Sequence, residues 1–165
     1  MQFLGLIPAR GGSKRIKRKN IIKLGGRPLI GHTILAAKNC RELNKILVST
    51  DDYQINKVAV EYGVEAHERP QYLATDHADA ISLIQYYFEL HNHIENIVYL
   101  QPTSPFRTAV TLSAAIRDFK MSECDVLVSI CRTPHALSSE KQFKIKDDGF
   151  VLSPQANPPR AQEIG

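Results

Sequence analysis

The chain has 165 residues, of which 43% are apolar and 23% charged, and its formal net charge is +4. This length suffices for one domain with a buried core, and the composition is typical of a globular protein. No run approaches the roughly 20 continuous apolar residues of a membrane-spanning helix, so we expect no membrane partner. Three cysteines without CxxC spacing favour buried thiols over disulfides or a zinc cluster.

The first predicted element is a strand over residues 3–7, too short and without the charged start of a signal peptide, so we expect a cytoplasmic protein. A glycine-rich basic loop, 9–20, follows it. Helical spacing and strand-like apolar runs then alternate along the chain. The predicted helices are 28–37, 52–62, 79–91 and 110–121, and the predicted strands are 45–50, 64–67, 96–100 and 125–130.

Particular residues support these elements. Pro28 fits the first turn of a helix, and Gly63 fits the end of one. In helix 79–91 the core positions predicted from spacing are Ile81, Ile84, Tyr87 and Phe88. Alternation of strand and helix predicts an α/β fold, namely a Rossmann-like, mostly parallel sheet with helices on both faces. A small β-hairpin is predicted beyond it, because Asp147-Asp148-Gly149 separates two short apolar segments.

The basic loop carries the strongest functional signal. Gly11 and Gly12 let the backbone approach a ligand, and Ser13 adds a hydroxyl. The pattern is neither a Walker A motif nor GxGxxG, yet it follows the opening strand. We favour phosphate binding over an ordinary turn, and a polyphosphate over nucleic acid because no aromatic residue interrupts the run to stack on bases. The loop and the residues just after it hold seven cations: Arg10, Lys14, Arg15, Lys17, Arg18, Lys19 and Lys23.

Other polar segments follow later strands, and ligands of parallel sheets bind beyond the carboxyl ends of the strands. Asp51 and Asp52 could bind a ribose or magnesium, but a helix cap is favoured. The segment 101–105 either presents Gln101 to a substrate or forms a turn with Ser104 or Thr108 as helix cap. Asp76 or Asp79 is predicted to cap the helix 79–91.

Together these segments resemble the N-acylneuraminate cytidylyltransferases, the CMP-sialic acid synthetases. The resemblance runs from about Phe3 to Ile130, and several motifs in a fixed order are more specific than any one alone. The matching motifs are IPARGGSK at 7–14, RKN at 18–20, GRPLI at 26–30, VSTD at 48–51, RP at 69–70 with LATD at 73–76, and LQPTSPFRT at 100–108.

The resemblance implies a nucleotide-diphospho-sugar transferase-like fold, with a nucleotide-binding domain over 1–133 and the start of a dimerisation and sugar-binding extension over 134–165. It implies that CTP and an acidic nine-carbon sugar, N-acetylneuraminate or legionaminate, give the CMP-sugar and pyrophosphate. Magnesium is the implied cofactor and a homodimer the implied assembly. An alternative is a truncated, non-catalytic CTP-binding module, or an enzyme like the CMP-pseudaminate or CMP-Kdo synthetases.

Site residues follow from the same resemblance. Arg10, Lys19 and Gln101 are the implied catalytic residues. The implied sugar contacts are Gln101, Ser104, Lys141 and Arg160. The metal ligands are unknown, because the family's carboxylates lie beyond the position of Gly165, and we expect the chain to be shortened there. The implied nucleotide contacts are Arg10, Gly11, Gly12, Ser13, Lys14, Lys19, Asn20, Arg69, Ala78 and Ala80.

Overall fold

A computed structural model describes residues 1–14, 16–130, 144–145 and 151–152. The chain divides into two units, Met1–Asp125 and Val126–Gly165. The predicted domain boundary after residue 133 lies outside the described residues. Within those residues, no helix is both long and apolar enough to cross a membrane.

The first unit is built on a four-stranded parallel sheet, in the order β5-β4-β1-β6. Its strands are β1 (Phe3–Pro8), β4 (Lys45–Thr50), β5 (Glu65–Glu68) and β6 (Asn96–Tyr99). All four strands run in the same direction, so their carboxyl ends lie at one edge. This confirms the predicted parallel α/β sheet and places the post-strand loops together at that edge.

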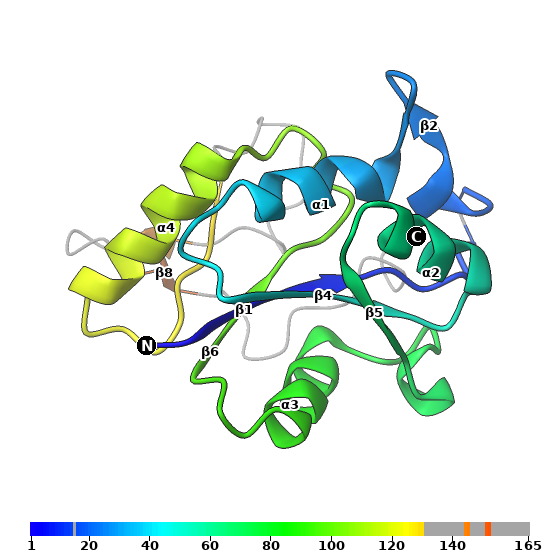
Figure 1. Ribbon diagram of the computed structural model, residues 1–165. Coiled ribbons are helices and arrows are strands. Elements are labelled where there is room, and N and C mark those ends of the chain that lie inside the picture. Colours follow the sequence, from blue (N-terminus) through cyan, green and yellow to red (C-terminus); the bar gives the residue numbers. More distant parts are fainter. Residues whose placement is uncertain (15, 131–143, 146–150, 153–165) are drawn as a thin grey trace. The chain divides into compact units, whose positions relative to one another are not determined.

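Helices cover both faces of this sheet, as Figure 1 shows. Helices α1 (Leu29–Lys38), α2 (Tyr53–Glu61) and α4 (Ala109–Met121) lie on one face, and α3 (Ala80–Leu90) lies on the other. Alternate residues of β1 serve the two cores, because successive side chains of a strand point to opposite faces. Phe3 and Ile7 pack with α1, α2 and α4, whereas Leu4 and Leu6 pack with α3.

The helix ends follow the expected chemistry. The Asp52 carboxylate accepts hydrogen bonds from the backbone N–H groups of Gln54 and Ile55, so Asp52 is the cap of α2. Asp79, rather than Asp76, caps α3, and Thr108, rather than Ser104, caps α4. Gly63 follows α2 with a φ of 68°, which glycine adopts without strain.

Short elements complete the first unit. Two turns of 3-10 helix span Lys19–Ile21 and Gln71–Leu73. The antiparallel pair β2 (Lys23–Leu24) and β3 (Arg27–Pro28) precedes α1. In the second unit, β7 (Lys144–Ile145) pairs antiparallel with β8 (Val151–Leu152), which confirms the predicted hairpin. The turn predicted at 147–149 lies outside the described residues.

Two predictions about the core were wrong. Ile81 is 66% exposed and Phe88 is 37% exposed, whereas α3 buries Tyr87, which was predicted, and Leu83, which was not. Residues 126–130 form no strand, and the Val126 side chain is 73% exposed. Strand propensity reflects how well a residue fits a sheet, and it does not form a strand without a partner.

A candidate anion-binding site at the carboxyl edge of the sheet

The basic loop after β1 is anchored to its neighbours through its backbone. The Ala9 N–H donates to the Ser49 carbonyl at 2.9 Å, and the Gly11 N–H donates to Asp51 Oδ1 at 2.8 Å. The buried Asn20 amide donates from Nδ2 to the Arg10 carbonyl at 3.0 Å. These contacts join the loop to β4 and to its own far end, so the loop has a defined position before any ligand binds.

Two cations of this loop converge on one carboxylate. Arg10 Nη1 lies 2.7 Å from Asp76 Oδ1, and Lys14 Nζ lies 2.5 Å from Asp76 Oδ2. The hydrogen bond from Lys14, together with Arg10, lowers the pKa of the Asp76 carboxyl group. Asp76 is therefore an anion at neutral pH, with one oxygen at each cation. The arrangement shows that Arg10 and Lys14 can hold a single oxyanion between them.

Arg69 is a second, buried source of positive charge at this edge. Its side chain is 7% exposed, and it donates from Nε to Ser49 Oγ at 3.0 Å and from Nη2 to the Ser49 carbonyl at 3.1 Å. Burial lowers the pKa of Arg69, but a guanidinium remains charged at neutral pH. No described carboxylate lies within ion-pair distance of Arg69, and a buried cation without an anionic partner is costly.

The hydroxyl groups of Tyr87 and Tyr99 interact electrostatically with Arg69. Burial raises the pKa of Tyr87 to about 12, and it also raises the pKa of Tyr99. The Tyr87 hydroxyl group lies 3.1 Å from His67 Nδ1. Both tyrosines are therefore neutral at pH 7 and do not cancel the charge of Arg69.

The remaining predicted residues occupy the same edge with differing roles. Gln101 follows β6, the neighbour of β1, and its Oε1 accepts from the Thr103 hydroxyl group at 3.3 Å. The N–H of Ala78, an implied nucleotide contact, donates to Thr75 Oγ1 at 3.2 Å. Ala80 is the first residue of α3. Gln101 and Ser104 are exposed, whereas Gly11, Ser13 and Lys19 are half-buried. Lys141 and Arg160 lie outside the described residues.

Sequence reasoning missed three partners in this site: Ser49, Asp51 and Asp76. Ser49 accepts a hydrogen bond from Arg69, and Asp51 accepts one from the Gly11 N–H. Asp76 forms ion pairs with Arg10 and Lys14. A signal for such partners did exist, because the basic segment 10–23 contains no acidic residue. Its counter-charges had to come from other loops at the same edge.

Three carboxylates at this edge make contacts within the protein. Asp51 accepts from the Gly11 backbone, Asp52 caps α2 with Arg18 Nη2 at 3.8 Å, and Asp76 holds Arg10 and Lys14. Within the described ranges, no group of three or more histidine, cysteine or acidic residues could hold a metal ion. The sequence assigned no ligands to magnesium, and magnesium binding stays a prediction.

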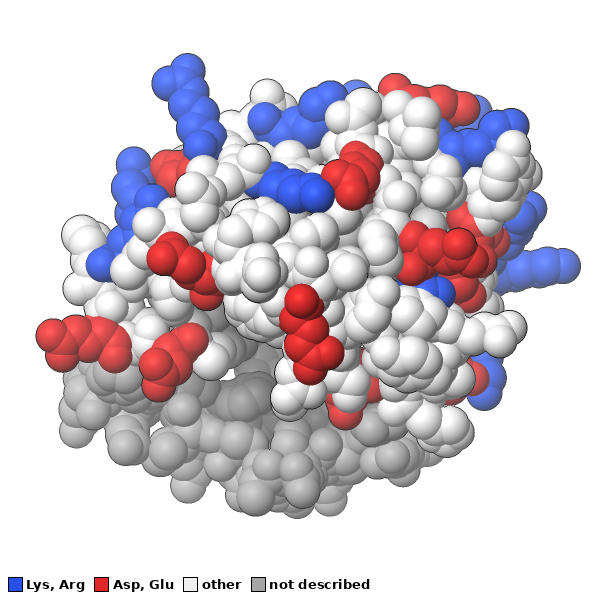
Figure 2. Space-filling view, turned by 60° about the horizontal axis from the view of Figure 1, so that its bottom comes forward, with Lys and Arg blue, Asp and Glu red and all other residues white. Residues whose placement is uncertain are grey.

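Acidic and basic side chains share the face of the molecule that Figure 2 shows. Lys and Arg lie mainly along the margins of the described surface, and Asp and Glu lie between them. The described part of this face therefore offers no continuous basic track for a nucleic-acid backbone.

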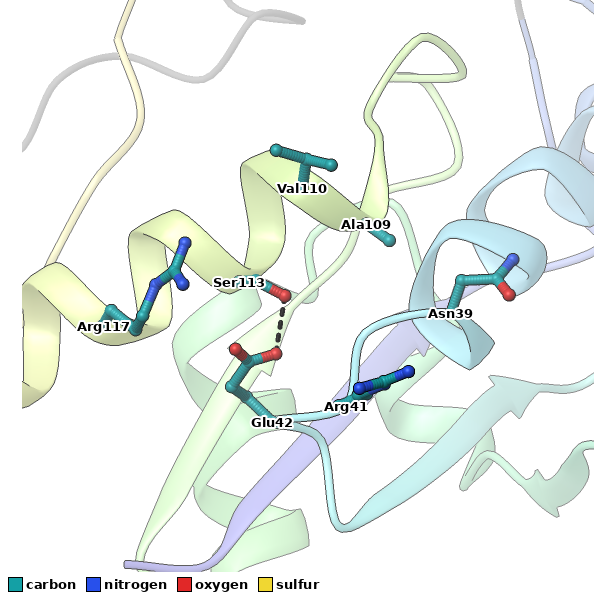
Figure 3. A pocket seen from close by; sticks show the side chains of 7 residues that line it. All are labelled: Asn39, Arg41, Glu42, Ala109, Val110, Ser113 and Arg117. Carbon is teal, nitrogen blue, oxygen red and sulfur yellow. Dashed lines mark hydrogen bonds between the residues drawn. The ribbon is translucent and has the colours of Figure 1, made fainter.

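A pocket of about 300 Å³ lies apart from the basic loop, between the segment before β4 and helix α4 (Figure 3). The Ser113 hydroxyl group donates to Glu42 Oε2 at 2.5 Å across it, and this hydrogen bond lowers the pKa of Glu42. This hydrogen bond joins α4 to the segment between α1 and β4. The pocket is also lined by Asn39, Arg41, Ala109, Val110 and Arg117.

Comparison with known proteins identifies the family. The family model described as "Cytidylyltransferase" matches residues 4–154. The chain is 38% identical over 160 residues to CMP-N,N'-diacetyllegionaminic acid synthase of Legionella pneumophila, covering 94% of this chain and 68% of that protein. It is 36% identical to pseudaminic acid cytidylyltransferase of Campylobacter jejuni, covering 99% of this chain and 73% of that protein.

A longer sequence relative and a solved structure are also similar to this chain. Identity to the N-acylneuraminate cytidylyltransferase of Escherichia coli is 34%, over 80% of this chain but only 32% of that protein. A CMP:2-keto-3-deoxy-manno-octonic acid synthetase solved with CTP has a TM-score of 0.60 at 22% identity, over 73% of this chain and 48% of the other. That likeness confirms the predicted nucleotidyltransferase fold.

Proposed function

Since this chain belongs to the cytidylyltransferase family, we propose that it joins CTP to an acidic nine-carbon sugar, giving the CMP-sugar and pyrophosphate. The curated relatives carry such activities in their names, and the legionaminic and pseudaminic acid relatives are matched over about two thirds or more of their length. The chain spans about a third of the length of the Escherichia coli relative. For that reason, the whole activity of that relative is not assigned to this chain.

The observation that carries the proposal is the convergence of Arg10 and Lys14 on the Asp76 carboxylate. Two cations that bind one carboxylate together can also bind phosphate oxygens, which are likewise anionic hydrogen-bond acceptors. The buried Arg69 adds a third positive charge at the same edge. A triphosphate is a ligand that could satisfy several cations at once.

In the proposed reaction, the oxygen of a sugar hydroxyl group forms a bond to the α-phosphorus of CTP, and the bond from that phosphorus to the bridging oxygen of pyrophosphate breaks. The proton of the hydroxyl group is released to water. Arg10, Lys14 and Lys19 would hold the triphosphate and stabilise the negative charge on the leaving group. Gln101, a neutral donor and acceptor, would orient the sugar. No nucleophilic side chain is required, because positioning and electrostatics carry this chemistry.

The sugar is proposed to be N-acetylneuraminate or legionaminate. Support comes from the GGSK segment at 11–14 and the QPTSP segment at 101–105, on which the family resemblance rests. Pseudaminate is the rival substrate, because the pseudaminic acid relative is almost as similar as the legionaminic acid relative. Turnover assays with each of the three sugars would decide between them.

Calorimetric titration of the chain with CTP, ATP and GTP, with and without magnesium, tests the nucleotide half of the proposal. We expect CTP to bind at least tenfold more tightly than ATP or GTP, which is a difference of about 1.4 kcal/mol. Equal affinity for all three nucleotides, or none for CTP, would contradict the proposal. Selective binding without turnover would identify a CTP-binding module instead.

Lys19→Ala is expected to weaken CTP binding about tenfold without unfolding the chain, because it removes one charge-assisted contact to phosphate. Lys19 opens a short 3-10 turn and is half-buried, so its side chain contributes little to the core. Lys57→Ala, on the exposed face of α2, is the matched control. Unchanged CTP affinity in the Lys19 variant would remove this residue from the site.

We extend the proposal to a magnesium-dependent homodimer of the cytoplasm, supported only by the family resemblance. The described residues supply no ligand set for the ion, so no step above depends on it. A sedimentation measurement that finds only monomer at high concentration would contradict the dimer. CTP binding that is unchanged by chelation would contradict the role of magnesium in binding.

A further inference from the structure

Asp76 occupies an unusual place for an acidic residue. It lies in the loop between β5 and α3, yet its carboxylate reaches two cations of the loop that follows β1. The side chains of Asp76 and Arg10 are 20% and 25% exposed, so this ion pair is partly shielded from water. Lys14 is 76% exposed, so it can move without disturbing the core.

The two oxygens of Asp76 meet the two cations separately, with Oδ1 at Arg10 and Oδ2 at Lys14. A phosphate group presents the same kind of anionic oxygens to such a pair. Ligand phosphate and Asp76 therefore need the same donors. If both anions occupied the site, like charges would lie close together in a partly shielded place, which is unfavourable.

We propose that Asp76 is an internal counter-anion that holds Arg10 and Lys14 in place in the empty site, gives them up to the triphosphate of CTP, and takes them back as pyrophosphate leaves. This inference rests on the proposed function. It makes Asp76 a positioning residue, because it acts on phosphate only through Arg10 and Lys14.

The consequence for affinity is counterintuitive. An incoming anion must compete with Asp76, so the carboxylate weakens binding of every polyphosphate, including the product. Removal of its charge without removal of its shape should strengthen binding. A purely structural role for Asp76 predicts the opposite, because a disordered loop would bind phosphate less well.

The test is calorimetric titration of inorganic pyrophosphate into the wild-type chain and into Asp76→Asn and Asp76→Glu. We expect Asp76→Asn to bind pyrophosphate about tenfold more tightly, since neither the partly shielded ion pair with Arg10 nor the more exposed one with Lys14 competes with it any longer. Asp76→Glu keeps the charge and is expected to stay within about threefold of the wild type. If Asp76→Asn does not fold, Asp76→Ser removes the same charge with a smaller side chain.

Asp118→Asn controls for the loss of one negative charge, because Asp118 is exposed on α4, which carries no site residue. It should leave the affinity for pyrophosphate unchanged. An equal gain in affinity in this control would show that the net charge of the chain explains the tighter binding by Asp76→Asn, and would overturn the inference. Unchanged or weaker pyrophosphate binding by folded Asp76→Asn would also overturn it, even where CTP binds selectively. If the wild-type chain binds neither CTP nor pyrophosphate, the proposed function fails first and this inference fails with it.

Discussion

Arg69→Met is expected to lower the affinity for CTP by about 10- to 100-fold, as loss of a charge-assisted hydrogen bond implies, while changing the free energy of unfolding by less than about 1 kcal/mol. The reason lies in how Arg69 is held. Its side chain is 7% exposed, and its hydrogen bonds go to Ser49 rather than to a carboxylate. The site therefore retains a buried positive charge that a ligand anion could neutralise.

Two opposing effects make the expected change in stability small. Methionine loses the hydrogen bonds from Arg69, each worth about 1 kcal/mol, but it also removes the cost of burying a charge that has no ionic partner among the described residues. The Ser49 carbonyl keeps its hydrogen bond from the Ala9 N–H, so it is not left without a partner. The apolar stem of arginine is replaced by a chain of similar length, so little packing is lost.

Thermal unfolding and CTP titration of the same protein sample measure the two effects separately. Arg107→Met is the control, because Arg107 is a half-buried arginine outside the predicted nucleotide contacts. If Arg69→Met unfolded readily while its folded fraction bound CTP normally, Arg69 would be a structural residue. The predicted nucleotide contact at Arg69 would then be wrong.

The sequence was informative wherever the decisive contacts are local. The cap of α2 and its end before Gly63 depend on neighbouring residues. The sequence predicted the cap at Asp51 or Asp52 and the stop at Gly63, and the structure has Asp52 as the cap. The alternation of Phe3 and Ile7 with Leu4 and Leu6 between two cores follows from the period of a strand.

Contacts between distant loops could not be predicted in the same way. The sequence predicted that Asp76 or Asp79 would cap α3, and only the fold shows that Asp79 does so and that Asp76 instead meets Arg10 and Lys14. Helix α3 shows a similar limit. Spacing correctly predicted Tyr87 in the core, but it also predicted Ile81 and Phe88 there and not the buried Leu83, since an apolar helix offers more than one face.

Gly11→Ala is expected to lower the free energy of unfolding by about 1–3 kcal/mol and to weaken CTP binding by at least about tenfold. A Cβ atom at Gly11 would lie 2.7 Å from both Cβ and Oδ2 of Asp52, closer than real Cβ contacts allow. Asp52 caps α2, and the Gly11 N–H donates to Asp51. Relief of the clash would therefore displace a helix cap, the anchor of the loop, or both.

Gly12→Ala provides a control within the same loop. A Cβ at Gly12 has no described atom within 4 Å and the residue has no positive φ, so the substitution should leave stability unchanged or raise it by up to about 1 kcal/mol. The two neighbouring glycines thus have different reasons for being glycine. Gly11 is required by packing against Asp52 within the protein, whereas Gly12 could be required only by close approach of a ligand. Equal destabilisation by both substitutions would show that the loop simply tolerates no side chain. A loss of CTP binding in stable Gly12→Ala would place the phosphates against the backbone at that residue.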